Sequence, residues 1–123
     1  MSRSRELVDW LETKKGYPYQ WNGKMGRPGY DCSGLVWDGF RQVGIALPHG
    51  SANQYRFSRK IPVSKAHEGC LLFKKRSNGT VYHVGVVVID GVIEAKGTAW
   101  GVIKRPYKRT EWQAAGKVDS LFV

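Results

Sequence analysis

Hydrophobic residues recur at helical spacing in the first half of the chain. Leu7, Trp10 and Leu11 fall on one face of residues 5–15, and this 3.6-residue period predicts an amphipathic helix. The same pattern predicts a second helix over residues 32–43. A short third helix is predicted over residues 50–58, with Ser51 as its cap. Gly16 is the expected end of the first helix. The second is expected to begin after Asp31 and to end at Gly44.

Residues 16–29, between the first two helices, read GYPYQWNGKMGRPG and contain four glycines and two prolines. Glycine and proline at this density predict a loop. The loop also carries three aromatic residues, Tyr17, Tyr19 and Trp21. These side chains either line a cleft or fasten the loop to the core, and the sequence leaves both roles open.

After Pro62 the pattern changes to short runs of β-branched residues separated by turn residues. The runs predict strands over residues 69–75, 80–89, 91–96 and 101–107, and residues 117–123 could add a last strand. Asp90-Gly91 is a strong signal for a two-residue hairpin turn. Helices followed by an antiparallel sheet define an α+β fold, and 123 residues suit a single domain over residues 1–123.

The chain holds 20 Lys and Arg residues against 10 Asp and Glu residues, a formal net charge of +10. This excess favours an anionic partner, such as an anionic cell-wall polymer, or else only a solvated basic surface. Nucleic acid is not expected, since zinc-finger spacing, an aromatic RNA-binding signature and heptads are missing from the sequence. No run approaches the ~18 apolar residues of a membrane span. We expect a monomer without a metal ion or cofactor.

Cys32 stands at the polar front edge of the second predicted helix, in the stretch GYDCSGLVWDGF. The helix dipole and the unpaired N–H groups at that position stabilise a thiolate, and they can hold the oxyanion that forms when a carbonyl is attacked. The position suits a nucleophile, but a small buried structural cysteine fits it equally well. A disulfide with Cys70 is also open, although two cysteines make neither a disulfide framework nor a metal-type pair.

A nucleophilic cysteine needs a base, and the chain has three histidines. His49 and His67 lie in polar, loop-like segments and are expected to be exposed. His83 lies inside the apolar run VYHVGVVVI, where an imidazole needs a partner to justify its burial. Because Cys32 offers that partner, we interpret His83 as the general base rather than as a satisfied core histidine.

Glu94 is a lone carboxylate in the apolar run VIEAK, and it is the candidate third group that orients His83. With Asp90-Gly91 as the turn, Val87 lies opposite Glu94, so His83 and Glu94 project from the same face of the sheet. This register separates them by about 13 Å at ~3.3 Å per residue, and a bulge or a different turn must close the gap. The alternative is a carboxylate paired with Lys96 or with an arginine.

Four segments, taken in order, resemble the NlpC family of papain-like cysteine peptidases, which are bacterial cell-wall endopeptidases. They are YPYQWNG, GYDCSGLVWDGFRQVGIALPHGSANQ, EGCLLFKK and HVGVVVIDGVIEAKG, and the resemblance covers residues 16–106. The most specific part is the DCSGLV segment followed at a family-like separation by HVG. The resemblance implies a papain-like fold in which N-terminal helices pack on a C-terminal antiparallel sheet.

The resemblance also implies catalytic roles. Cys32 would be the nucleophile, His83 the general base, and Glu94 would stand where the family usually carries a second histidine. An anion at that place favours the imidazolium form of His83, and so a thiolate–imidazolium pair. A further departure from the family is Gly69-Cys70 where the family usually has Gly-Asp, and Cys70 is therefore expected to be a buried structural thiol.

The resemblance implies a substrate as well, a peptidoglycan stem peptide cut between γ-D-glutamate and the diamino acid. Tyr19 would reach the active site from its loop, and Trp21 is included with it as a candidate substrate contact. In some members of the family the residues beside the cysteine, here Asp31 and Ser33, bind the free amine of an N-terminal L-alanine.

Other activities remain open at this stage. The same cysteine and histidine would serve an N-acetylmuramoyl-L-alanine amidase or an acyl- or amide-transferring toxin. A non-catalytic module that binds anionic wall polymers would need only the positive charge. The N-terminus MSRSRELVDWLETKK lacks the apolar core of a secretory signal, so we expect delivery to the wall by phage lysis, by a phage tail or secretion system, or as part of a larger protein.

Overall fold

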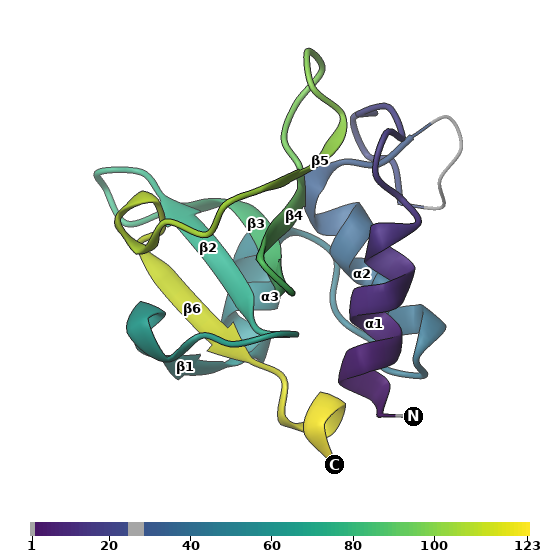
Figure 1. The fold of residues 1–123 in the computed structure, drawn as a ribbon. Coiled ribbons are helices and arrows are strands. Elements are labelled where there is room, and N and C mark those ends of the chain that lie inside the picture. The colour runs from purple at the N-terminus through teal and green to yellow at the C-terminus, as the bar shows by residue number, and fades with distance from the viewer. Residues whose placement is uncertain (1, 25–28) are drawn as a thin grey trace.

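The computed structural model describes residues 2–24 and 29–123. Three N-terminal helices pack against a six-stranded sheet (Figure 1), which confirms the α+β fold predicted from the sequence. Residues 25–28 of the predicted loop lie outside the described residues. Within the described residues, none of the helices has the length and apolar character needed to cross a membrane.

The helices lie close to their predicted positions: α1 is Arg3–Glu12, α2 is Cys32–Gln42 and α3 is Ser51–Phe57. Helix α1 begins earlier than the apolar pattern predicts, because the Ser2 side chain caps it by accepting a hydrogen bond from the Arg5 N–H. The prediction that Ser51 caps α3 is wrong. Gly50 is the N-cap residue there, and Ser51 is the first residue of the helix.

The strands are β1 (Arg59–Ile61), β2 (Leu71–Lys75), β3 (Val81–Val88), β4 (Gly91–Ala95), β5 (Val102–Arg105) and β6 (Ala114–Lys117). They lie in the order β1-β6-β2-β3-β4-β5, and all neighbouring strands are antiparallel. The prediction of a last strand over residues 117–123 is wrong. Strand β6 ends at Lys117, and Asp119–Phe122 form a 3₁₀ turn. The small residues AAG of β6 carry little strand signal, which is why it was not predicted.

The hairpin between β3 and β4 turns one residue earlier than Asp90-Gly91. Ile89 and Asp90 form the turn, and Val88 pairs with Gly91. Asp90 lies in the left-handed region with φ 64°, a conformation that aspartate tolerates better than most residues. The observed register therefore differs by two residues from the predicted one.

This shift changes which residues face each other near Glu94. Continued one step past the last recorded pair, the register sets Gly85 opposite Glu94, whereas the prediction set Val87 there. Side chains two residues apart on a strand project from the same face, so the shift keeps His83 and Glu94 on one face. It also brings them two residues closer together.

The core occupies both faces of the sheet. The larger cluster lies between the helices and the sheet and includes Leu7, Leu11, Leu35, Phe40 and Phe73. A smaller cluster consists of Cys70, Leu72, Val87, Val92, Trp112 and Ala115. Strand β3 contributes to both clusters, which explains the consecutive apolar residues Val86–Val88. Cys70 is fully buried as expected, and both cysteines are free.

Candidate active site

Cys32 is the first residue of α2 and is half-buried. Asp31 caps this helix, because its Oδ1 accepts a hydrogen bond of 2.6 Å from the Gly34 N–H. Gly34 leaves no room for a side chain, since a Cβ there would lie 1.9 Å from the carbonyl oxygen of Gly23. The loop and the helix start thus pack backbone against backbone, and the thiol is held at the positive end of α2.

Helix α3 also fixes the start of α2. Gln54 is fully buried, and its Nε2 donates hydrogen bonds to the carbonyl oxygens of Ser33 at 3.0 Å and Pro48 at 3.1 Å. The end of the second family-like segment, PHGSANQ, therefore supports the backbone beside Cys32.

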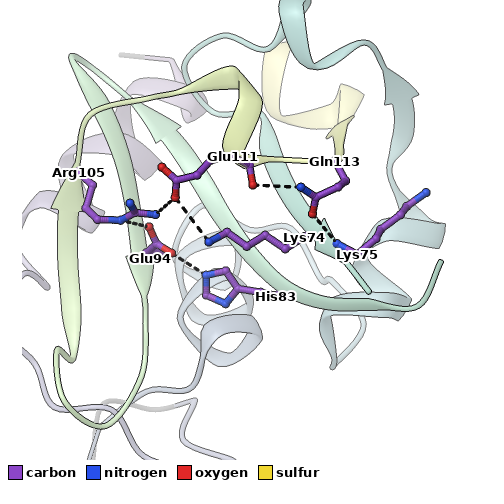
Figure 2. A network of polar contacts seen from close by, with 7 residues as sticks. All are labelled: Lys74, Lys75, His83, Glu94, Arg105, Glu111 and Gln113. Atoms are coloured by element: carbon purple, nitrogen blue, oxygen red, sulfur yellow. Dashed lines mark hydrogen bonds and ion pairs between the residues drawn. The ribbon is translucent and has the colours of Figure 1, made fainter. Parts of the chain in front are cut away.

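His83 on β3 and Glu94 on β4 are joined by a 2.7 Å hydrogen bond between Nε2 and Oε1 (Figure 2). His83 is 9% exposed and Glu94 is 1% exposed. The two-residue register shift closes the gap that the predicted register left. Because Nε2 is used by Glu94, Nδ1 is the ring nitrogen left for a second partner.

Cys32 lines the same cleft as His83 and acts on the charge of its ring. Burial by itself lowers the pKa of the His83 imidazole, but the hydrogen bonds and negative charges of Cys32 and Glu94 outweigh this effect and raise the pKa to about 9. The ring therefore carries a proton at neutral pH. Burial opposes the charge of Glu94 in the same way, yet His83 and Arg105 hold the pKa of this carboxyl below its usual range.

Glu94 belongs to a chain of alternating charges that runs from Lys74 through Glu111, Arg105 and Glu94 to His83 (Figure 2). Arg105 donates from Nε to Oε2 of Glu94 at 2.8 Å and from a terminal nitrogen to Glu111 at 2.5 Å. Glu111 lies 3.5 Å from the Lys74 ammonium. In the strand register, Lys74 of β2 lies opposite His83 of β3. Glu94 thus binds a histidine and an arginine at once.

Trp112 covers the His83 ring. The two ring centroids are 5.8 Å apart with an angle of 20° between the planes, and the Lys74 ammonium lies 5.0 Å from the Trp112 ring centroid. Gly85 makes room for this stack, because a Cβ there would lie 3.1 Å from Cη2 of Trp112 and 3.4 Å from Cβ of Glu94. The imidazole is therefore held by ring packing as well as by its hydrogen bond to Glu94.

A cleft of about 250 Å³ joins these groups, and it is lined by Tyr19, Cys32, Lys74, Tyr82, His83, Glu94 and Lys96. Burial, together with the negative charges of Cys32 and Asp31, raises the pKa of the Tyr19 hydroxyl. The aromatic residues of the loop therefore differ in whether they line a cleft or fasten the loop to the core. Tyr19 lines the cleft, whereas the Tyr17 ring packs 5.8 Å from that of Tyr30.

A second cavity of about 430 Å³ opens beside the first turn of α2, and it is lined by Asn22, Lys24, Asp31, Ser33, Gly34, His49 and Gly50. Asp31 and Ser33 line this cavity while Cys32 lines the other, so the start of α2 separates the two. Trp21 is 74% exposed and lines neither of these cavities. His49 and His67 are exposed as expected, and His49 stacks on Trp37 with centroids 4.9 Å apart.

Sequence reasoning missed three residues that support the site: Arg105, Trp112 and Lys74. Arg105 on β5 lies opposite Val92 on β4. Val92 and Glu94 are two residues apart, so Arg105 and Glu94 project from the same face of the sheet, and this could be predicted once the register is known. Trp112 lies in an irregular segment that carries no periodic signal. A cysteine at a helix start that shares a cleft with a strand-borne histidine defines a site of the papain-like type.

Comparisons with known proteins agree with this assignment. The NlpC/P60 family model matches residues 16–118. The peptidoglycan endopeptidase RipB of Mycobacterium tuberculosis is 33% identical over 125 residues, which cover 88% of this chain and 51% of RipB. The γ-D-glutamyl-L-lysine dipeptidyl-peptidase of Bacillus subtilis is 33% identical over 78 residues, 62% of this chain and 26% of that protein.

Among solved structures, the NlpC/p60 domain of the peptidoglycan hydrolase SagA superposes with a TM-score of 0.83 at 28% identity, covering 94% of this chain and 98% of that one. The chain belongs to the NlpC/P60 family. It spans at most about half the length of the two curated relatives named above.

Proposed function

We propose that the protein is a cysteine peptidase that acts on the bacterial cell wall as a peptidoglycan endopeptidase. The observation that carries the proposal is one cleft shared by Cys32 and the hydrogen-bonded pair His83–Glu94. Cys32 is assigned as the nucleophile, His83 as the general acid and base, and Glu94 as the group that orients His83. The family membership supports the substrate, since RipB and SagA are both named for action on peptidoglycan.

In the first half-reaction the Cys32 thiolate attacks the carbonyl carbon of the scissile amide. The oxyanion that forms is assigned to N–H groups in the first turn of α2. The His83 imidazolium then gives its proton to the leaving nitrogen, the C–N bond breaks, and the amine product departs. A thioester on Cys32 and a neutral His83 remain.

In the second half-reaction the neutral His83 takes a proton from water, and the resulting hydroxide attacks the thioester. The C–S bond breaks, the carboxylic acid product leaves, and the thiolate–imidazolium pair is restored. Glu94 accepts a hydrogen bond from Nε2 throughout, so it holds the ring in the orientation that serves Cys32 and stabilises its charged form.

We propose the bond between γ-D-glutamate and the diamino acid as the scissile one. The B. subtilis relative is named for a γ-D-glutamyl-L-lysine dipeptidyl-peptidase activity, which supports this choice. The acyl half is assigned to the cavity of Asp31 and Ser33, which would bind the free amine of an N-terminal L-alanine. Tyr19, in the cleft, is assigned as a contact near the scissile bond, and Trp21 as a contact from the exposed part of the same loop.

The test is digestion of purified peptidoglycans that contain either diaminopimelate or lysine, followed by mass spectrometry of the released fragments. The proposal expects a new free amine on the diamino acid and a new γ-carboxyl on D-glutamate, both missing after treatment with Cys32→Ala. A folded wild-type protein that cleaves none of these peptidoglycans would overturn it.

The same experiment separates the alternatives. An N-acetylmuramoyl-L-alanine amidase would release intact stem peptides with a new N-terminal L-alanine. A module that only binds anionic wall polymers through its +10 charge would leave every bond intact, and its binding to the wall would survive Cys32→Ala.

A further inference from the structure

We infer that Lys96 forms a carboxylate-binding subsite in the active cleft, and that it selects stem peptides with a free carboxylate, rather than a carboxamide, beside the scissile bond. The inference rests on the proposed function and specifies its substrate class. It starts from the location of Lys96, which lines the same cleft as Cys32 and His83. Lys96 follows the last residue of β4 and is two positions from Glu94.

The backbone around Lys96 is well fixed. Its N–H donates to the carbonyl oxygen of Gly101 at 3.0 Å, and within the turn the Trp100 N–H donates to the carbonyl oxygen of Gly97 at 3.0 Å. The N–H of Val102, the residue after Gly101, donates to the carbonyl oxygen of Tyr17 at 2.9 Å. The turn at residues 97–100 is therefore tied to the loop that carries Tyr19, and Lys96 extends from a closed, anchored hairpin end.

The ammonium group of Lys96 is held without being neutralised. It lies 4.4 Å from the ring centroid of Trp100, which is 58% exposed. A cation–π contact positions the ammonium but leaves its full charge. Among residues 2–24 and 29–123, no carboxylate forms an ion pair with Lys96.

The other charges of the cleft are already satisfied. Lys74 lies 3.5 Å from Glu111. Glu94 is buried and accepts hydrogen bonds from both His83 and Arg105. Among the described residues that line the cleft, Lys96 is thus the one uncompensated cation, and a carboxylate is a group that such a cation binds well.

The proposed substrate offers carboxylates near the scissile bond. A γ-linked D-glutamate keeps its α-carboxylate, and diaminopimelate carries an additional carboxylate of its own. Conversion of either group to a carboxamide preserves the shape but removes the charge. The subsite therefore predicts slower cleavage when the carboxylate that meets Lys96 is amidated.

Four soluble stem peptides test this: free acid at both positions, amidated at D-glutamate, amidated at diaminopimelate, and amidated at both. We expect the wild-type kcat/KM to fall about 10-fold on amidation of one of these positions, a factor typical of one charge-assisted hydrogen bond. In Lys96→Met and Lys96→Gln the acid-to-amide ratio should fall to near 1, and Lys96→Arg should keep it. Lys65→Met, which removes an exposed lysine of the 3₁₀ turn at Val63–Lys65, should keep the wild-type ratio.

Equal cleavage of all four peptides by the wild type would overturn the subsite and leave the endopeptidase proposal standing. Retained discrimination in both Lys96→Met and Lys96→Gln would have the same meaning. Failure of the folded wild type to cleave any of the four, and any peptidoglycan, would overturn the proposed function and the subsite together.

Discussion

The Nε2 atom of His83 and the Oε1 atom of Glu94 lie 2.7 Å apart at a point where both side chains are almost fully removed from water. Removal of one partner leaves the other as a buried, poorly compensated group, which is costly for stability. The pair therefore has two measurable consequences, one for the chemistry of the cleft and one for the folded state.

Glu94→Gln keeps the shape of the side chain and removes its charge. We expect kcat to fall roughly 10- to 10³-fold, less than the ~10⁴-fold loss for the equivalent change in a serine triad, because a thiolate is intrinsically the better nucleophile. KM should change little. Glu68→Gln, at an exposed glutamate, is the matched control.

The same variant should alter the dependence of kcat/KM on pH. His83 must be protonated for the first half-reaction, and its pKa of about 9 predicts that activity falls as the pH rises through that value. Glu94 helps to raise this pKa, so its loss lowers the pKa and moves the alkaline limb to lower pH. If Glu94→Gln keeps the wild-type alkaline limb and the wild-type kcat, Glu94 does not support His83 and acts only as the ion-pair partner of Arg105.

Arg105→Met tests whether the arginine positions Glu94. The change leaves a buried carboxylate with one donor fewer, so we expect the free energy of unfolding to drop by about 1–3 kcal/mol. We also expect kcat to drop several-fold with little change in KM, and Arg105→Lys to restore part of both. Arg59→Met breaks an exposed ion pair with Asp119, and because solvent screens such a pair it should leave both the stability and kcat close to the wild-type values.

The two thiols should react very differently. Iodoacetamide should label Cys32, which lines the cleft, before Cys70, which is fully buried and whose thiol pKa is raised by that burial. Cys32→Ala should abolish hydrolysis, and Cys70→Ala should preserve it. Peptide mapping after timed alkylation gives the answer, and faster labelling of Cys70 would count against Cys32 as the nucleophile.

The net charge of +10 should matter for binding to the wall rather than for the chemical step. Cleavage of intact walls should decrease as ionic strength rises and the Debye length shrinks from ~30 Å at 0.01 M to ~8 Å at 0.15 M. Cleavage of a small neutral stem peptide should change little over the same range. Equal salt sensitivity of both reactions would mean that the charge acts inside the cleft.

The sequence predicted which residues meet in the cleft more fully than it predicted their geometry. Cys32 was found by its place at a helix start, and His83 and Glu94 as polar residues in apolar strands, because each breaks a local pattern. Arg105 and Trp112 break no such pattern. Their roles depend on how β4, β5 and the segment after them lie against β3, which is set by tertiary packing.

The turn between β3 and β4 shows the same limit. Asp90-Gly91 has the composition of a two-residue turn, yet the chain turns at Ile89-Asp90. Both registers bury the same residues, since a shift of two positions does not exchange the faces of a strand. Hydrophobic patterning alone could not choose between them.

That equivalence has a consequence for folding. A hairpin slipped by two residues would bury its apolar side chains on the proper faces, so hydrophobic burial would penalise it weakly. It would, however, set Glu94 beside Val87, leave a buried carboxylate without His83, and withdraw Gly85 from the space that Trp112 needs. The polar groups of the site therefore favour the observed strand alignment over the slipped one, which the apolar side chains would tolerate.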